Sequence, residues 1–281
     1  MLEKVVAQIK PLDESAMAKC QLRLNNLTKP LGSLHAFEHL ACKMAGITRR
    51  PRPQKSVPAL VLMNGSRRTM GMSDTFAAQV SAQLICFDVA TIEKPTAEQI
   101  LQVMEQGVEI ACRASAQGVQ VIGTGSVDVP HPAMLARIIE QVRGGAGGMA
   151  IINASGSLVV AGLVGVMLGA AATGSAIVLD GSLTSAAALI ACRIAPPVRE
   201  YLVGSHFSKE PYQAEILELI NLPAYLYLEM NVGEGVAAAL GISLIHASLH
   251  VLNDMKTFGE AEVSVAEDGP GALVQNRNVR D

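Results

Sequence analysis

The chain contains few aromatic residues and few charged ones. Aromatic residues make up 3% of its 281 positions, tryptophan is absent, and charged residues make up 17%. The core must therefore consist mainly of aliphatic side chains with alanine and glycine, which favours closely packed layers of helix and sheet. The formal net charge of −3 at pH 7 lacks the basic excess that nucleic-acid binding requires, so we expect no nucleic-acid partner.

The cysteines lack the spacing of a metal site or of a disulfide framework. They are Cys20, Cys42, Cys86, Cys112 and Cys192. An odd and scattered set of this kind is typical of reduced thiols in a cytoplasmic protein. The first twenty residues also lack the apolar core of a signal peptide. We therefore expect a cytoplasmic protein.

Residues 158–179 contain no charged residue and are long enough to cross a bilayer. The pattern within this run favours another interpretation. A helical pattern over residues 158–172 ends at a glycine, and a short β-branched run over residues 175–179 follows it. A second helix over residues 186–195 and a second strand over residues 201–203 complete a parallel crossover. We therefore expect a unit buried in an α/β domain, and no membrane partner.

Polar residues follow each of these two strands. They are Asp180-Gly181 after the first strand and Ser205-His206 after the second. Ligands of open α/β sheets bind at the carboxyl ends of the strands, so both loops are candidate binding loops. The alternative stays open that Asp180 only caps a helix and that His206 is an ordinary loop histidine.

Residues 59–63 and 119–122 are predicted as further buried strands. The first leads into Asn64-Gly65-Ser66-Arg67-Arg68, a polar loop that suits an anion. The second leads into Gly123-Thr124-Gly125-Ser126, but the full G-x-G-x-x-G spacing is absent and two prolines follow closely. We therefore reject a dinucleotide-binding fingerprint.

Most of the remaining chain has helical patterns. Helices are predicted over residues 14–27, 34–45, 73–87, 96–117, 133–142, 212–219, 224–230 and 235–255, and a further strand over residues 149–152. Within the apolar run, Gly165 and Gly169 have GxxxG spacing, which we expect to let their helix lie close to the sheet.

His246, His250 and Asp254 lie at i, i+4 and i+8 on one face of the last predicted helix. This spacing is compatible with a metal site. On an otherwise apolar helix, a packed or interfacial stripe is the more common arrangement. We therefore predict no metal there.

Several short segments occur in an order that resembles one enzyme family. They are TKPLGSL at 28–34, GLVGVMLGAA at 162–171, VLDG at 178–181, AAALIACR at 186–193, GSHFS at 204–208, and GEG at 233–235 followed by AAAL at 237–240. Together they are similar to the nicotinate-nucleotide–dimethylbenzimidazole phosphoribosyltransferases, enzymes of the lower-ligand branch of cobalamin assembly. The likeness is dense over residues 157–240 and clear again over residues 28–47.

The resemblance implies a fold and an assembly. The expected fold class is α/β, a doubly wound and mainly parallel sheet with helices on both faces, plus a small helical lobe from both ends of the chain. We expect residues 1–50 and 211–281 to form the small lobe and residues 51–210 to form the α/β core. The resemblance also implies a homodimer.

The resemblance further implies a reaction. The family transfers phosphoribose from nicotinate mononucleotide to dimethylbenzimidazole, releasing nicotinate and forming α-ribazole phosphate. Its base is the glutamate of a Gly-Glu-Gly motif, which here is Glu234. The pyridinium leaving group departs neutral at its ring nitrogen, so the resemblance implies neither a metal nor a cofactor. Glu234 also has a structural alternative, since a glutamate at the start of the last helix compensates the helix dipole.

The substrate-binding residues implied by the resemblance lie on the strand-end loops and on the Gly-Glu-Gly motif. They are Asp180, Gly181, Ser205, His206, Gly233, Gly235, Gly125 and Ser126. Among these, Gly181, Ser205 and His206 are the candidates for holding the phosphate.

The sequence departs from the family pattern at several places. Asn64-Gly65-Ser66-Arg67 stands where the family has Asp-His-Gly, and Ser126 stands where it has a second carboxylate. The Asn-Thr-Thr that follows in the family is missing here. Segments are also missing between residues 90 and 94 and between residues 133 and 157, where the family has a substrate-contacting loop with a lysine. The alternative function is therefore an impaired paralogue that binds a nucleotide or an aromatic base without turnover.

Overall fold

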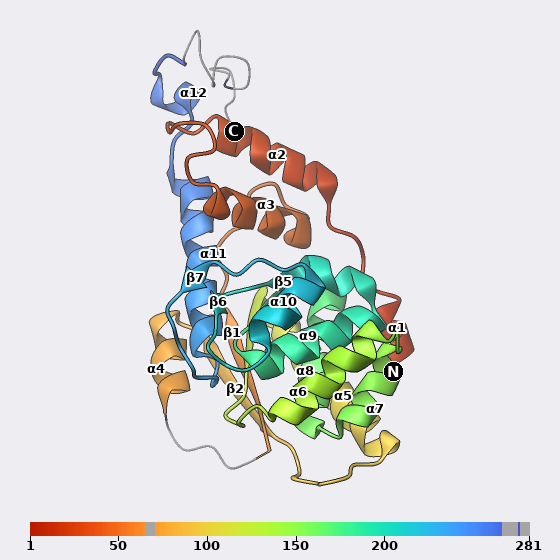
Figure 1. Ribbon diagram of the computed structural model, residues 1–281. Coiled ribbons are helices and arrows are strands. Elements are labelled where there is room, and N and C mark those ends of the chain that lie inside the picture. Colours follow the sequence, from red (N-terminus) through yellow and green to blue (C-terminus); the bar gives the residue numbers. More distant parts are fainter. Residues whose placement is uncertain (66–70, 266–274, 276–281) are drawn as a thin grey trace. The chain divides into compact units, whose positions relative to one another are not determined.

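The computed structural model of the chain describes residues 1–65, 71–265 and 275 (Figure 1). The chain divides into two compact units. The sheet unit consists of Met1–Pro11 with Ser56–Ile242, and the helical unit consists of Leu12–Lys55 with Ser243–Asp281. Residues 211–242, which the sequence analysis placed in the small lobe, lie in the sheet unit because the segment that starts the last long helix packs on the sheet.

Five parallel strands form the main sheet, in the order β2-β1-β3-β4-β5. They are β1 (Ala59–Asn64), β2 (Gln83–Asp88), β3 (Val121–Gly125), β4 (Ala176–Val178) and β5 (Leu202–Val203). β1, β3 and β4 are buried along their whole length, as expected of parallel strands covered on both faces. The chain reverses its direction of strand addition between β1 and β3. Their carboxyl ends therefore flank the point where sheets of this order bind ligands.

Helices cover both faces of this sheet, which confirms the predicted fold class. A Cβ atom built on Gly162 of α8 (Leu158–Thr173) would be 2.7 Å from Met63 Cε of β1. A Cβ atom built on Gly235, just before α11 (Val236–Asp254), would be 2.8 Å from Leu60 Cδ1. Leu60 and Met63 are three residues apart in one strand, so their side chains point to opposite faces. α8 therefore packs on one face and the start of α11 on the other.

The other helices of the sheet unit lie between its strands, except for α1, which precedes β1. They are α1 (Leu2–Val6), α4 (Met72–Gln79), α5 (Ala97–Ala116), α6 (Pro132–Arg143), α7 (Gly148–Ser155), α9 (Ser182–Ile194), the 3-10 helix η1 (Pro196–Tyr201) and α10 (Gln213–Ile220). A second, two-stranded parallel sheet pairs β6 (His206–Phe207) with β7 (Leu226–Tyr227). Three sequence predictions were wrong here: residues 73–87 form α4 and then β2, residues 149–152 are helical in α7, and residues 224–230 contain β7.

The GxxxG glycines of α8 face another helix rather than the sheet, which corrects the sequence prediction. A Cβ atom on Gly165 would be 2.0 Å from Met104 O, and one on Gly169 would be 2.8 Å from Val108 O. Met104 and Val108 both belong to α5. The two small residues therefore allow the backbones of α5 and α8 to touch, which no residue with a Cβ atom permits without a shift.

Residues 158–203, which begin with the charge-free run, fold as predicted, as a helix, a strand, a helix and a strand. α8 and β4 are separated by Gly174, which is in the left-handed conformation and ends the helix. Among the described residues, α11 is the one helix that is long and apolar enough to cross a membrane. Of its most apolar window, 61% is buried inside the protein, as in a core helix.

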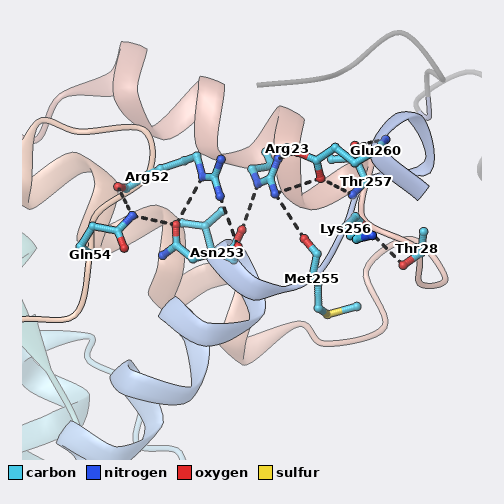
Figure 2. Close-up of polar contacts among 10 residues, drawn as sticks. Arg23, Thr28, Arg52, Gln54, Asn253, Met255, Lys256, Thr257 and Glu260 are labelled. Atoms are coloured by element: carbon cyan, nitrogen blue, oxygen red, sulfur yellow. Dashed lines mark hydrogen bonds and ion pairs between the residues drawn. The ribbon is translucent and has the colours of Figure 1, made fainter. Parts of the chain in front are cut away.

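The helical unit joins segments from both ends of the chain. It contains α2 (Glu14–Asn25), α3 (Ala36–Thr48), the second part of α11 and α12 (Phe258–Ala261), around a core that includes Leu24, Ala41 and Leu252. Figure 2 shows Arg23 of α2 at the carboxyl end of α11. Its guanidinium donates to Leu252 O at 3.0 Å and to Met255 O at 3.2 Å, and it pairs with Glu260 at 2.9 Å. A cation at this position satisfies carbonyls that the helix leaves unpaired.

Candidate active site

The Gly233-Glu234-Gly235 motif forms a strained loop directly before α11. Glu234 and Gly235 have consecutive left-handed conformations, with φ of 59° and 78°. For a residue with a side chain this conformation costs about 1–2 kcal/mol. Surrounding contacts must therefore hold the loop in place, and non-glycine strain of this kind is concentrated at functional sites.

The ends of β3 and β4 supply these contacts. The Glu234 N–H donates to Ser126 O at 2.8 Å, after β3. After β4, the Asp180 carboxylate accepts from Gly235 N at 2.8 Å and from Ala237 N at 2.9 Å. The backbone from which the Glu234 side chain extends is therefore held by residues that follow two strands of the sheet.

Asp180 acts as the N-terminal cap of α11. Its side chain is buried, and its two oxygens accept from amides that the helix itself leaves unpaired. Burial raises the pKa of Asp180 to about 7, the amide hydrogen bonds oppose this rise, and the nearby charge of Glu210 adds to it. Asp180 thus caps a helix, as the alternative interpretation of the sequence proposed. That helix is α11 and not α9, which follows Asp180 in sequence.

The Glu234 carboxylate is placed differently. The residue is half-buried, and its side chain has no hydrogen-bond partner among the described residues. Because Asp180 already caps α11, the helix does not need Glu234 for that purpose. The Glu234 carboxylate therefore extends from a fixed backbone and can accept a hydrogen bond from a ligand.

Glycine is required where the motif approaches β3. A Cβ atom on Gly125 would be 2.4 Å from Gly235 N, and one on Gly233 would be 2.7 Å from Ser126 O. These three glycines, all predicted as binding residues, permit the close contact between the loop and the strand end.

The loop after β4 already holds an acidic group of the protein itself. Glu210 accepts from Ser182 N, the first amide of α9, at 2.5 Å, and Ser182 Oγ donates to Pro211 O at 2.7 Å. A carboxylate at a helix N-terminus occupies the place that an anionic ligand would take. The cavity beside Asp180, Gly181 and Glu210 has a volume of about 10 Å³, which is room for about one water molecule.

Ser205 and His206 are buried, and neither lines a cavity described here. Ser205 Oγ donates to Leu179 O at 2.6 Å and lies 3.3 Å from His206 Nδ1. Because the hydroxyl has a single proton, Nδ1 is the donor of that contact, and Nε2 is left as a buried acceptor without a partner among the described residues. Burial lowers the pKa of His206 to about 4, so its ring is neutral at pH 7.

Hydrogen bonds cross-link the loops after β1 and β3. Asn64 Oδ1 accepts from Val127 N at 3.2 Å, and Asp128 accepts from Gly65 N at 2.9 Å. Ser126 Oγ accepts from Asp128 N at 3.1 Å. Sequence reasoning did not assign Asn64 or Asp128 this role. The remainder of the predicted anion loop, Ser66 to Arg68, lies outside the described residues.

A larger cavity of about 370 Å³ lies beside these loops. We name it the switch-point cavity. Its lining includes Gly65, Ile92, Asp128, Met134, Arg137 and Ser157. Its volume is within the range of small-molecule sites, and its lining combines apolar side chains with a few polar ones, as such sites do.

Residues 1–65, 71–265 and 275 contain no group of three or more His, Cys, Asp and Glu side chains arranged to hold a metal. In the predicted stripe of α11, His250 Nδ1 lies 2.6 Å from Asp254 Oδ2. His246 is buried, and its Nε2 has no hydrogen-bond partner in the described part of the chain. The stripe therefore consists of an exposed pair and a separate buried histidine.

Comparison with known proteins identifies relatives over most of the chain. A family model described as "Phosphoribosyltransferase" matches residues 9–86 and 131–263. A nicotinate-nucleotide–dimethylbenzimidazole phosphoribosyltransferase of Geobacter sp. (strain M21) is 30% identical, with 94% of this chain and 99% of the relative covered. One of Roseiflexus sp. (strain RS-1) is 29% identical, with 94% and 98% covered. The crystal structure of CobT from Thermus thermophilus has a TM-score of 0.81 at 22% identity, with 90% of this chain and 100% of that chain covered.

The relatives are longer than this chain. The alignment with the Geobacter protein spans 347 positions, which is 66 more than the 281 residues present here. The family model also leaves residues 87–130 unmatched, and these include Gly125, Ser126 and Asp128. The part of the site contributed by the end of β3 therefore lies outside the two segments that the family model matches.

Proposed function

The chain belongs to the nicotinate-nucleotide–dimethylbenzimidazole phosphoribosyltransferase family, and we propose that it transfers phosphoribose from nicotinate mononucleotide to dimethylbenzimidazole or a related base. The products are nicotinate and an α-ribazole phosphate. The proposed enzyme acts in cobalamin lower-ligand synthesis, as a cytoplasmic homodimer.

The observation that carries this proposal is the Gly233-Glu234-Gly235 loop. Its backbone is tied to Ser126 and Asp180, while the Glu234 carboxylate has no partner among the described residues. A catalytic base needs this combination of a fixed position and an unoccupied acceptor. A glutamate that served only the stability of α11 would not need a strained backbone next to a helix that Asp180 already caps.

The proposed reaction balances without a metal or a redox partner. A ring nitrogen of the benzimidazole forms a bond to the ribose C1′ as the bond from C1′ to the pyridinium nitrogen breaks. The electron pair of that bond neutralises the pyridinium, and nicotinate leaves. The proton on the other benzimidazole nitrogen passes to Glu234. Attack from the face opposite the leaving group inverts C1′, so a β-nucleotide gives an α-riboside.

The remaining residues predicted for the site have supporting roles in this proposal. Asp180 and Ser126 hold the loop, and Gly125, Gly233 and Gly235 allow its approach to β3. The loops that contain Gly181, Ser205 and His206 form the adjoining wall.

A second candidate function is binding without turnover. Ser126 occupies the place of the second carboxylate of the family pattern, and its hydroxyl is engaged by Asp128 N. The cavity beside Gly233 and Asp180 has a volume of about 10 Å³, which is too small for a base. Both observations weigh against turnover beside Glu234, while the larger switch-point cavity has the volume to bind a nucleotide or an aromatic base.

A turnover assay with nicotinate mononucleotide and dimethylbenzimidazole tests the proposal. We expect wild type to form riboside phosphate and Glu234→Gln to be slower by about 100-fold or more, the usual effect of losing a general base. Glu229→Gln is the matched control, because Glu229 is also left-handed, lies in the same segment and is exposed. Equal rates in the two variants would refute the role of Glu234. No product from wild type, with a raised melting temperature on adding either substrate, would establish the second candidate.

A further inference from the structure

The donor proposed above carries a phosphate, and the sites expected for it are occupied or closed. Glu210 already binds the first amide of α9, and Ser205 and His206 are buried and line neither described cavity. A phosphate placed beside Gly181 would meet a carboxylate instead of free amides. These contacts favour a phosphate site elsewhere in the described part of the chain.

We propose that Arg137 binds the donor phosphate in the switch-point cavity. This inference rests on the proposed function, because it assigns a position to one group of the proposed donor. The cavity lies beside the loops after β1 and β3, where a sheet of this strand order binds ligands.

Arg137 is suited to this role by its position and its partners. It extends from α6, lines the cavity, and donates from Nη1 to Ala154 O at 3.4 Å. No carboxylate pairs with it among the described residues. A guanidinium has five N–H donors in a fixed plane, so one contact to a carbonyl leaves a free edge for a bidentate bond to phosphate.

The start of α8 adds further donors at the same cavity. Ser157 caps the helix, and its Oγ accepts from Val160 N at 3.2 Å. The amides of Leu158 and Val159, which also line the cavity, have no acceptor among the described residues. The first turn of this 16-residue helix contains no acidic residue. At the start of α9, by contrast, Glu210 from another segment already accepts from the first amide. Free amides at a helix N-terminus favour an anion and complement the arginine.

The cavity also contains a charge of the opposite sign, which indicates the kind of ligand it accepts. Asp128 lines the cavity together with Arg137, and Ile92 and Met134 supply apolar surface. A nucleotide with a pyridinium ring and a phosphate carries both signs of charge and matches this lining.

Calorimetric binding of nicotinate mononucleotide and of its riboside, which lacks the phosphate, tests this assignment. We expect wild type to bind the mononucleotide more tightly than the riboside. In Arg137→Gln, the Kd of the mononucleotide should rise by about 10-fold or more, in line with the loss of a charged hydrogen bond, while the Kd of the riboside stays unchanged. The Kd of the mononucleotide for Arg137→Lys should lie between those of wild type and Arg137→Gln, because a lysine retains the charge without the bidentate geometry.

Arg143→Gln is the matched control, since Arg143 is an exposed arginine of the same helix that pairs with Glu215 outside the cavity lining. Equal affinities of wild type and Arg137→Gln for the mononucleotide would overturn the assignment, as would the absence of mononucleotide binding by wild type. Binding requires no chemistry, so the two proposals can fail separately. Phosphate-dependent binding without turnover refutes the proposed function alone, and turnover with an unchanged KM in Arg137→Gln refutes this inference alone.

Discussion

At the scale of single residues, Asp180 and Glu234 show how similar side chains acquire different roles. Asp180 is buried, and both of its oxygens accept backbone amides. Glu234 is half-buried, and its carboxylate lacks a partner among the described residues. The first carboxylate therefore positions the backbone that carries the second.

The raised pKa of Asp180 predicts a pH-dependent contribution to stability. Burial raises this pKa from 3.8 to about 7, so the folded state holds a proton that the unfolded state releases. The stability that the protonated Asp180 side chain contributes to the folded state is full below about pH 4 and is lost as pH rises to about 7. We expect the unfolding free energy of wild type to fall over this range relative to that of Asp180→Asn, measured by urea denaturation. The unfolding free energy of Glu98→Gln, at an exposed carboxylate, should change with pH in parallel with that of wild type. A curve for Asp180→Asn that is also parallel to wild type would contradict Asp180 as the source of the pH dependence.

His206 predicts the opposite pH dependence. Burial lowers its pKa from 6.5 to about 4, so the unfolded state binds a proton that the folded state excludes. Its contribution to stability is full above about pH 6.5 and is lost as pH falls to about 4. In the same urea experiment, His206→Leu should lose less stability than wild type on acidification. His131→Leu, at an exposed histidine without a carboxylate partner among the described residues, serves as the control, and equal acid sensitivity of both variants would rule out His206 as the source.

At the scale of helices and strands, the close contact of α5 and α8 is the most specific packing feature. The Cβ atom of an alanine at Gly165 would lie 2.0 Å from Met104 O, and the backbone of a buried helix cannot easily move away. We expect Gly165→Ala to destabilise the protein by about 1–3 kcal/mol through overpacking, measured by urea denaturation. Gly147→Ala is the control, because a Cβ atom there would have no described atom within 4 Å. Equal stability of the two variants would show that the helices are not held this closely.

The strands and helices differ in how far the sequence predicts them. β1, β3 and β4 are recognisable because fully buried parallel strands are continuous apolar runs bounded by turn residues. β2 was missed because it is partly exposed at the sheet edge, and its residues continue the helical pattern of α4. β7 has only two residues, and its pairing with β6 is too short to leave a pattern of its own.

The candidate site was predictable in part, for a similar reason. The Gly-Glu-Gly loop could be found because the motif is continuous in sequence. Glu210 and Arg137 could not, because their roles depend on which helix N-terminus and which cavity the fold brings to them. Asp180 was found from its place at a strand end, but its partners lie more than fifty residues away in sequence.

At the scale of the whole chain, distant segments combine within each unit. In the helical unit, Arg23 connects α2 to the carboxyl end of α11 and to Glu260 (Figure 2). We expect Arg23→Leu to destabilise this unit by about 1–3 kcal/mol, because it leaves buried carbonyls unpaired. Arg50→Gln, at an exposed arginine of the same unit, should have little effect. Amide hydrogen exchange of α2 and α12 measures this loss of stability. Exchange rates in Arg23→Leu equal to those of wild type would contradict the predicted destabilisation.

The left-handed loop before α11 exists, in the function proposed here, to present the Glu234 carboxylate. Glu234→Gly tests this most directly, because glycine adopts the same conformation without strain while removing the proposed base. We expect riboside phosphate formation to fall by about 100-fold or more while the melting temperature stays equal or rises. If Glu234 instead served to compensate the dipole of α11, the variant would lose about 0.3–1 kcal/mol of stability and keep its turnover, which would contradict the role of Glu234 as the base.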